Sequence, residues 1–241
     1  MYTVTATRFD EPRNNVLGMA SINYGDMFQI NSIRIMQSRH GNVFVSMPQR
    51  KTNRIDNEKN SPVYEDICCP ITKEFREELY NKILESFDKG EKVVGKADLT
   101  EPAKYNLKIT PYKEMHNFQA GKASLYLDDR FVLNNIKLII NRNGDFNIGM
   151  PSVKSKSTDS QGKDNWNAIF FPKTKSFAAQ FYSDVKKLAR KKMDLEELIT
   201  KNSQIEQDRK RVAEENQDAI NKSKQTTMPE AEQNPPKKQR R

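Results

Sequence analysis

The chain carries the same segment twice, and this duplication constrains its fold more than any other feature. Residues 2–48 match residues 105–151 at a constant offset of 103 without a gap, and fifteen of the 47 aligned pairs are identical. After one deletion the match resumes at an offset of 102, where Ile67 corresponds to Ile169. Such a repeat predicts one structural unit formed twice. It also provides an internal comparison, because a residue that the shared fold needs should have an equivalent in the other copy.

Each copy is expected to form an antiparallel sheet of about four strands followed by one helix, which is an α+β unit. Segments of alternating apolar and polar residues run through residues 2–47 and recur in the second copy, as is typical of strands with one buried face. The odd spacing between Ile30 and Ile33, repeated at Leu133 and Ile136, predicts a bulge or bend in the third strand.

A helical period begins in each copy after a threonine, Thr72 or Thr174, which is the expected N-cap. Before each helix, a Met-Pro corner at Met47-Pro48 or Met150-Pro151 ends the sheet, because proline cannot donate to a strand ladder. A polar loop of some 15 residues follows each corner. Loops of this length are uncommon, so we expect these two to be functional or mobile.

The expected domain organisation follows from these patterns. The units are a first domain over residues 1–87, a linker over 88–104, a second domain over 105–188, a charged helical extension over 189–221 and a basic tail over 222–241. The apolar stripe of the extension is thin, so it is either a weak coiled coil or a solvated helix. The tail is rich in Ser, Gln, Asn and Pro and is expected to be disordered.

The positive charge lies in the second half of the chain. Residues 1–104 have 15 basic and 15 acidic side chains, residues 105–185 have 11 and 7, and residues 186–241 have 15 and 10, which accounts for the net charge of +9. A basic surface favours polyanions, although it also serves solubility alone. No apolar run is long enough to span a bilayer and the N-terminus lacks signal-peptide features, so we expect a cytoplasmic protein without a membrane partner.

The internal comparison argues against catalysis. His40 corresponds to Asn143 and His116 to Arg13, so neither histidine recurs. The two cysteines correspond to Phe170 and Phe171, which indicates a packing role. The sequence has neither a phosphate-cradling glycine loop nor metal-ligand spacing. We therefore expect a protein that is not an enzyme and uses no cofactor, metal or small-molecule substrate.

The order and spacing of several motifs resemble one known family. Residues 33–35 (IRI), 41–52 (GNVFVSMPQRKT) and 66–71 (DICCPI) closely resemble the SpoVG family of bacterial septation regulators, and residues 143–151 and 168–172 resemble a diverged member. The resemblance implies a small α+β domain that forms homodimers and binds DNA and RNA as a regulator, with a link to cell division and spore development. Because family members usually have one domain per chain, the two repeats are expected to pack as an intrachain pseudo-dimer.

The resemblance also suggests which residues contact nucleic acid. The family's basic stretch after the Met-Pro corner maps onto Arg50, Lys51 and Thr52, followed by Arg54; in the second copy Val153 replaces Arg50, and Lys154 and Lys156 remain. Polar loops at a sheet edge could present these cations to phosphates, or could be basic by chance. Both helices also begin with a lysine, Lys73 or Lys175, where a cation opposes the helix dipole, which suggests a phosphate contact.

Three further features leave alternatives open. The tail residues Lys237, Lys238, Arg240 and Arg241 could be a localisation signal or, as the bacterial resemblance favours, a nucleic-acid arm. Tyr64 and Trp166 at equivalent positions could stack on bases or pack over the helix. The rival to a DNA- or RNA-binding regulator is a protein-interaction adaptor, or a septation regulator, that acts through the helical extension. Self-association through domain edges or the extension is a further expectation.

Overall fold

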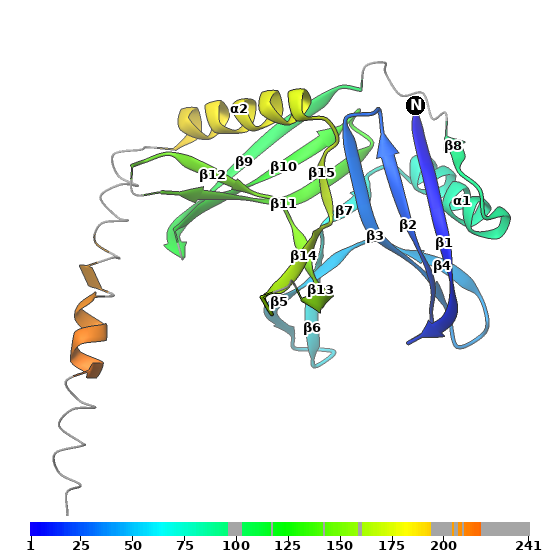
Figure 1. Cartoon of the computed structure of the whole chain (residues 1–241), viewed down its shortest axis with the longest axis horizontal. Coiled ribbons are helices and arrows are strands. Elements are labelled where there is room, and N and C mark those ends of the chain that lie inside the picture. Colours follow the sequence, from blue (N-terminus) through cyan, green and yellow to red (C-terminus); the bar gives the residue numbers. More distant parts are fainter. Residues whose placement is uncertain are drawn as a thin grey trace, which may run out of the picture.

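The computed structural model describes residues 1–95, 103–116, 118–141, 143–158 and 161–193, together with positions 204, 207–208 and 210–217. It is an α+β protein in which the two repeats lie side by side (Figure 1). The first repeat consists of β1 (Tyr2–Arg13), β2 (Val16–Tyr24), β3 (Phe28–Gln37), β4 (Val43–Ser46), β5 (Gln49–Asp56), β6 (Ser61–Asp66), β7 (Cys68–Pro70), α1 (Lys73–Lys89) and β8 (Val93–Gly95). The second consists of β9 (Tyr105–His116), β10 (Gln119–Leu127), β11 (Phe131–Ile140), β12 (Phe146–Gly149), β13 (Ser152–Thr158), β14 (Asp164–Ala168), β15 (Phe170–Pro172) and α2 (Lys175–Lys192).

The expected four-stranded meanders are confirmed. In the first repeat the pairing runs β1-β2-β3-β4, and in the second β9-β10-β11-β12, all antiparallel. The predicted helix starts are also confirmed, because the Thr72 and Thr174 hydroxyls accept the backbone N–H groups of Phe75 and Phe177, each at 3.2 Å. Each helix packs its apolar face on its own sheet and leaves the opposite face of the sheet open.

The two repeats exchange a strand. The short strand β7 of the first repeat pairs with β11 of the second, and β15 of the second repeat pairs with β3 of the first. The registers are equivalent, since Cys68 lies opposite Leu133 and Phe170 lies opposite Ile30. This reciprocal pairing is the arrangement expected of an intrachain pseudo-dimer.

The predicted bulge lies where the exchange begins. Ser32 and Asn135, at equivalent positions, have φ values of 63° and 65°, and the register of β3 and β11 shifts there. On the edge of β3 away from β2, the bulge separates residues 34–37, which pair with β4, from residues 28–30, which pair with the crossing strand β15. β11 is divided between β12 and β7 in the same way. Next to it, the backbone N–H groups of Asn31 and Asn134 donate to the carbonyls of Ile169 and Ile67, both at 2.6 Å.

One continuous core joins the repeats. Phe131 of the second repeat stacks on Tyr24 with ring centroids 6.2 Å apart and meets Phe75 of α1 edge-on. Symmetrically, Phe28 of the first repeat meets Phe177 and Phe181 of α2 edge-on, at 5.1 and 5.2 Å. Each helix therefore covers a core residue of the other repeat, and Phe28 and Phe131 are buried by residues of both repeats.

Two expected boundaries differ from the structure. α1 continues to Lys89 and β8 pairs with the edge strand β1, so residues 88–95 of the expected linker belong to the first folded unit. α2 continues to Lys192, and Ala189 and Met193 are buried, so residues 189–193 of the expected extension belong to the second. Positions 210–217 are helical, and the tail over 222–241 lies outside the described residues. Within the described residues, no helix combines the length and apolarity needed to cross a membrane.

The adjacent cysteines are packing residues, as expected. Cys68 is buried in β7, and burial raises the pKa of its thiol well above the ordinary value. Burial likewise raises the pKa of Cys69 to about 11. Both thiols are therefore protonated at neutral pH and unsuited to attack as nucleophiles. In the described part of the chain, no cluster of three or more His, Cys, Asp and Glu side chains could hold a metal ion.

Candidate nucleic-acid interface

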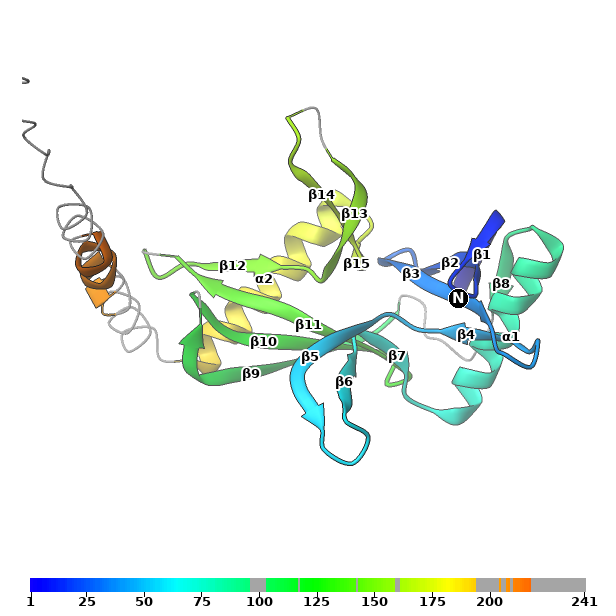
Figure 2. The same ribbon diagram turned by 90° about the horizontal axis from the view of Figure 1, so that it is seen from below.

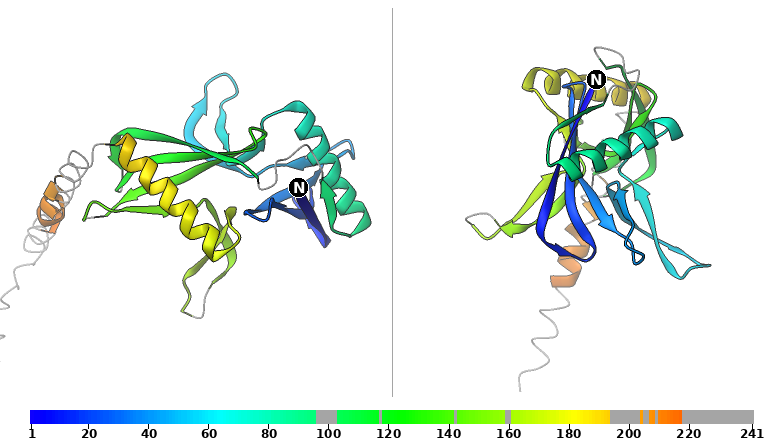
Figure 3. Two further views of the ribbon diagram at one scale, coloured as in Figure 1. Left: turned by 90° about the horizontal axis from the view of Figure 1, so that it is seen from above. Right: turned by 90° about the vertical axis from the view of Figure 1, so that its right-hand side faces the viewer.

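The polar segments after the Met-Pro corners are β-hairpins rather than loops. We call β5–β6 the first arm and β13–β14 the second arm. Each base is closed by equivalent hydrogen bonds: Ile67 N–H to the Pro48 carbonyl at 2.9 Å, and Ile169 N–H to the Pro151 carbonyl at 2.8 Å. Both arms project away from α2 (Figure 1), and they point to opposite sides when seen from below (Figure 2). In the right-hand view of Figure 3 they diverge from each other on the side of the molecule away from α2.

On one face of the first arm a carboxylate holds two of the predicted contact residues. Glu65 accepts hydrogen bonds from Arg50 and Arg54, with an oxygen 2.8 Å from each Nη2 atom. The hydrogen bond from Arg50 is the main reason why the pKa of Glu65 is lowered. Thr52, the third predicted residue, has an internal role, because its hydroxyl donates to the Val63 carbonyl at 2.9 Å and accepts the Arg54 N–H at 3.2 Å.

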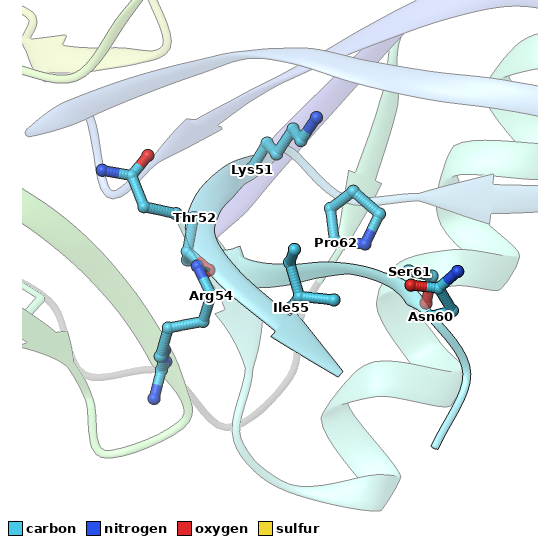
Figure 4. Close-up of a pocket in the computed structure, with 8 residues that line it drawn as sticks. Lys51, Thr52, Arg54, Ile55, Asn60, Ser61 and Pro62 are labelled. Carbon is cyan, nitrogen blue, oxygen red and sulfur yellow. Dashed lines mark hydrogen bonds between the residues drawn. The ribbon is translucent and has the colours of Figure 1, made fainter. Parts of the chain in front are cut away.

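Lys51 lies apart from this ion-pair network. It is the cross-strand partner of Tyr64, and within the described residues its side chain makes no hydrogen bond or ion pair. Figure 4 shows Lys51 and Arg54 extending in different directions from β5, around a shallow hollow that Ile55, Asn60 and Pro62 help to line. Of the four residues predicted on this arm, Lys51 is thus the one whose charge is available without breaking an ion pair.

The second arm presents fewer cations. Lys154 pairs across the strands with Trp166 and forms an ion pair with Asp164 at 2.8 Å. Lys156 is part of β13, but its side chain lies outside the described part of the structure. Where the first arm has the Arg50–Glu65 pair, the second has Val153 opposite Asn167, so the two arms differ on that face.

The remaining predicted residues are not joined to the arms by any contact in the described structure. Lys73 and Lys175 are the first residues of α1 and α2; both are exposed, and Lys73 lies 3.9 Å from Glu77. A phosphate contact at either helix start remains a prediction. The tail cations Lys237, Lys238, Arg240 and Arg241 lie outside the described residues.

A set of lysines that the sequence reasoning missed lies on the open face of the second sheet. Lys122 in β10 is directly opposite Lys137 in β11, and Lys108 in β9 points to the same face. Within the described residues, none of the three forms an ion pair within 4.0 Å. The equivalent positions of the first sheet are Thr5, Met19 and Arg34. Strand alternation could have revealed this face, because the lysines alternate with buried residues such as Ala123 and Leu138.

Because β7 crosses to the second sheet, the first arm borders this lysine face. Glu65 and Asp66 of the arm line a groove together with Lys122, Asn134 and Asn135. Lys122 also contributes to the lowered pKa of Glu65, after the effects of Arg50. The base of the first arm and the lysine face therefore adjoin, and the groove between them combines residues from both repeats. We refer to the lysine face and the adjoining first arm together as the basic surface; among the described residues, Lys108, Lys122 and Lys137 on the sheet and Lys51 on the arm have no ion pair within 4.0 Å.

The fold and the arms define a class: a small α+β unit, here duplicated and interlocked, with a sheet covered by one helix on one face and a hairpin beside the other. The SpoVG family model matches the chain twice, over residues 1–89 and 103–188. The chain thus belongs to the SpoVG family, as the sequence motifs predicted.

Curated relatives support the assignment. The "Putative septation protein SpoVG" of Treponema denticola is 30% identical over 78 residues, which is 32% of this chain and 75% of the relative. The protein of the same name from Clostridium beijerinckii is 34% identical over 72 residues, covering 30% of this chain and 70% of the relative. Each of these two matches is therefore about one repeat long. No solved structure matches the chain significantly.

Proposed function

We propose that the protein is a non-enzymatic regulator that binds the phosphate backbone of DNA or RNA through the basic surface. The observation that carries the proposal is the direct opposition of Lys122 and Lys137 on a sheet face that neither α1 nor α2 covers. Like charges placed opposite each other destabilise a sheet. A polyanion lying across the face would offset this repulsion and release counterions from the nucleic acid.

The relatives are named for septation, and we infer that this chain acts in the same process. Nucleic-acid binding and septation are compatible roles, since a regulator can act on cell division through the nucleic acid that it binds. The two repeats would act together, because the first arm and the lysine face come from different repeats and meet only through the exchanged strands.

Salt-dependent binding of the full chain tests the proposal. We expect the affinity for short duplex DNA to fall with salt, with a log–log slope of about −0.9 per phosphate neutralised. The double variant Lys122→Ala/Lys137→Ala should weaken binding and flatten the slope by about 1 per lysine. Arg50→Ala/Lys51→Ala should flatten it less, because Arg50 is already paired with Glu65. Fluorescence anisotropy of a labelled duplex measures each slope.

Two further variants make the test specific. Lys186→Ala/Lys187→Ala on α2 removes the same charge from the side of the molecule away from the arms, and it should leave the slope nearly unchanged. Glu65→Gln should steepen the slope by about 1 to 2, because it releases Arg50 and Arg54 for phosphates. Equal effects of the α2 and β10–β11 variants would show that only net charge matters and would remove the basic surface from the proposal.

The adaptor is the second candidate function, in which the helical extension captures a protein partner. The helical positions 210–217 favour it, since all of them are exposed and charged or polar residues predominate. Deleting residues 194–241 separates the two candidates while keeping the buried Met193. Under the main proposal the truncated protein keeps nucleic-acid binding that depends on Lys122 and Lys137, whereas an adaptor loses its partner.

A further inference from the structure

Each arm exposes one large aromatic side chain at an equivalent position. Tyr64 in β6 is 57% exposed and Trp166 in β14 is 61% exposed. Their positions correspond at the offset of 102 that relates the second parts of the repeats. Neither ring makes a ring–ring or cation–π contact within the described residues. The exposure of both rings argues against the alternative that they pack over the helices.

Each exposed ring also lies directly across the hairpin from a lysine. Lys51 is opposite Tyr64, and Lys154 is opposite Trp166. The neighbouring cross-strand position has diverged completely, from Arg50 opposite Glu65 to Val153 opposite Asn167. The two arms thus share the aromatic–lysine pair although the cross-strand pair beside it differs.

We propose that these pairs bind unpaired nucleotides, with a base stacked on Tyr64 or Trp166 and an adjacent phosphate held by Lys51 or Lys154. The inference rests on the proposed function and specifies its substrate as single-stranded DNA or RNA. Stacking on aromatic side chains suits any base, because every base has a π face, and it contributes about 1–3 kcal/mol per base. A basic surface nearby adds backbone affinity without selecting a sequence.

The surroundings of the rings favour a base over an apolar protein partner. Trp166 lies opposite Lys154, and both of its neighbours in β14, Asn165 and Asn167, are polar, so the ring is flanked by polar or charged residues along and across the hairpin. A protein contact of this size would need a contiguous apolar patch. A nucleotide instead combines a flat apolar face with polar edges and a phosphate, which matches the composition of each arm. Paired bases in a duplex are already stacked on their neighbours and cannot occupy the rings.

Trp166 is the only tryptophan in the chain, so its fluorescence reports on one arm directly. We would titrate the full chain with a single-stranded thymidine oligonucleotide and with a duplex of equal length, following Trp166 emission and the anisotropy of labelled DNA. We expect the single strand, but not the duplex, to quench Trp166. Tyr64→Ala and Trp166→Ala should each weaken single-strand binding about tenfold and change duplex binding less than about twofold.

Controls separate stacking from a general loss of apolar surface. Val153→Ala in the second arm and Ile71→Ala outside the first arm remove exposed aliphatic groups and should leave single-strand affinity unchanged. Trp166→Phe should retain most of the affinity, because a phenyl ring still offers a face.

The outcomes distinguish this inference from the proposed function. Binding could remain salt-dependent while Trp166 emission is not quenched and Tyr64→Ala and Trp166→Ala bind with wild-type affinity. That result would overturn the stacking proposal and leave the proposed function intact. Binding to neither single strands nor duplexes would overturn both. If Tyr64→Ala or Trp166→Ala changed the oligomeric state but not the affinity, the rings would belong to a protein contact and the inference would be wrong.

Discussion

The two repeats are alike where they interlock and different where they face solvent. At the junction, the bulges at Ser32 and Asn135 and the crossing strands β7 and β15 have the same geometry in both repeats. On the open faces, Lys108, Lys122 and Lys137 of the second sheet replace Thr5, Met19 and Arg34 of the first. The difference shows that pairing constrains the junction, whereas each face is free to specialise.

The edges of the two sheets differ as well. In the first repeat β8 covers the edge strand β1, and the buried Ser86 hydroxyl extends this cover by accepting the Ala6 N–H at 3.0 Å. In the second repeat Leu188 stands at the position of Ser86, and among the described residues no strand pairs with the outer edge of β9. A homodimer has two identical faces and two identical edges. Joining the repeats in one chain removes that restriction, so one half can become basic while the other is closed.

The largest effect on stability is expected from substitutions in the junction, where the two repeats are alike. Phe131→Ala and Phe28→Ala should each lower the free energy of unfolding by about 3–5 kcal/mol, because both rings are fully buried between the repeats. Urea denaturation followed by circular dichroism and by Trp166 emission measures the change. Both variants should show one cooperative transition, since the core is shared.

A matched control is Phe9→Ala, which removes an exposed ring from β1 and should cost little. If Phe131→Ala instead produced two separate transitions, the repeats would be folding as independent domains. The strand exchange would then contribute little to stability, and the likeness of the two repeats at the junction would not reflect a shared core.

Much of each repeat could be predicted from the sequence, because its signals are local. Alternation gave the meander strands, Thr72 and Thr174 marked the helix starts, and the odd spacing from Ile30 to Ile33 located the bulge. The strand exchange between the repeats was harder to predict from the sequence. The run Ile67-Cys68-Cys69 indicates burial, but a three-residue strand does not say which sheet it joins, since that choice depends on contacts distant in sequence.

The candidate site was less predictable for two physical reasons. The arms have solvent on both faces, so their strands lack the alternation of apolar and polar residues that identifies half-buried strands. The lysine face is spread over three strands, so its members Lys108, Lys122 and Lys137 are far apart in sequence and form no basic run. The pairing of Glu65 with Arg50 and Arg54 likewise depends on the hairpin register.

The difference between the outer edges of the two sheets predicts a smaller effect on the free energy of unfolding. Ser86→Ala should cost about 1–3 kcal/mol, because it leaves the buried Ala6 N–H without its acceptor and the Glu91 carbonyl without the donor that lies at 2.6 Å. Ser183→Ala on the exposed side of α2 is the control and should be nearly neutral. Chemical denaturation measures both. A neutral Ser86→Ala variant would mean that water replaces the hydroxyl, and that the edge of the first repeat is no more closed than that of the second.

The smallest effect is expected at an ion pair that only one side of the junction has. Lys173 donates to Asp26 at 2.6 Å, whereas the equivalent of Lys173 near Asp129 is Ile71. The pair is exposed, so Lys173→Ala should cost less than about 1 kcal/mol. Lys175→Ala, which removes an exposed cation outside this pair, is the control and should cost nothing measurable.

Acid should abolish this small difference between the wild type and Lys173→Ala. The hydrogen bond from Lys173 is the main cause of the lowered pKa of Asp26. A carboxyl whose pKa is lowered on folding stabilises the protein above its unfolded pKa of about 3.9, and this contribution is lost as the pH falls through the folded value. The difference in unfolding free energy between the two proteins should therefore narrow progressively as the pH falls below about 3.9, and high salt should narrow the neutral-pH difference as well. If the difference grew in acid, the asymmetry at this corner would come from packing of the Lys173 side chain and not from its charge.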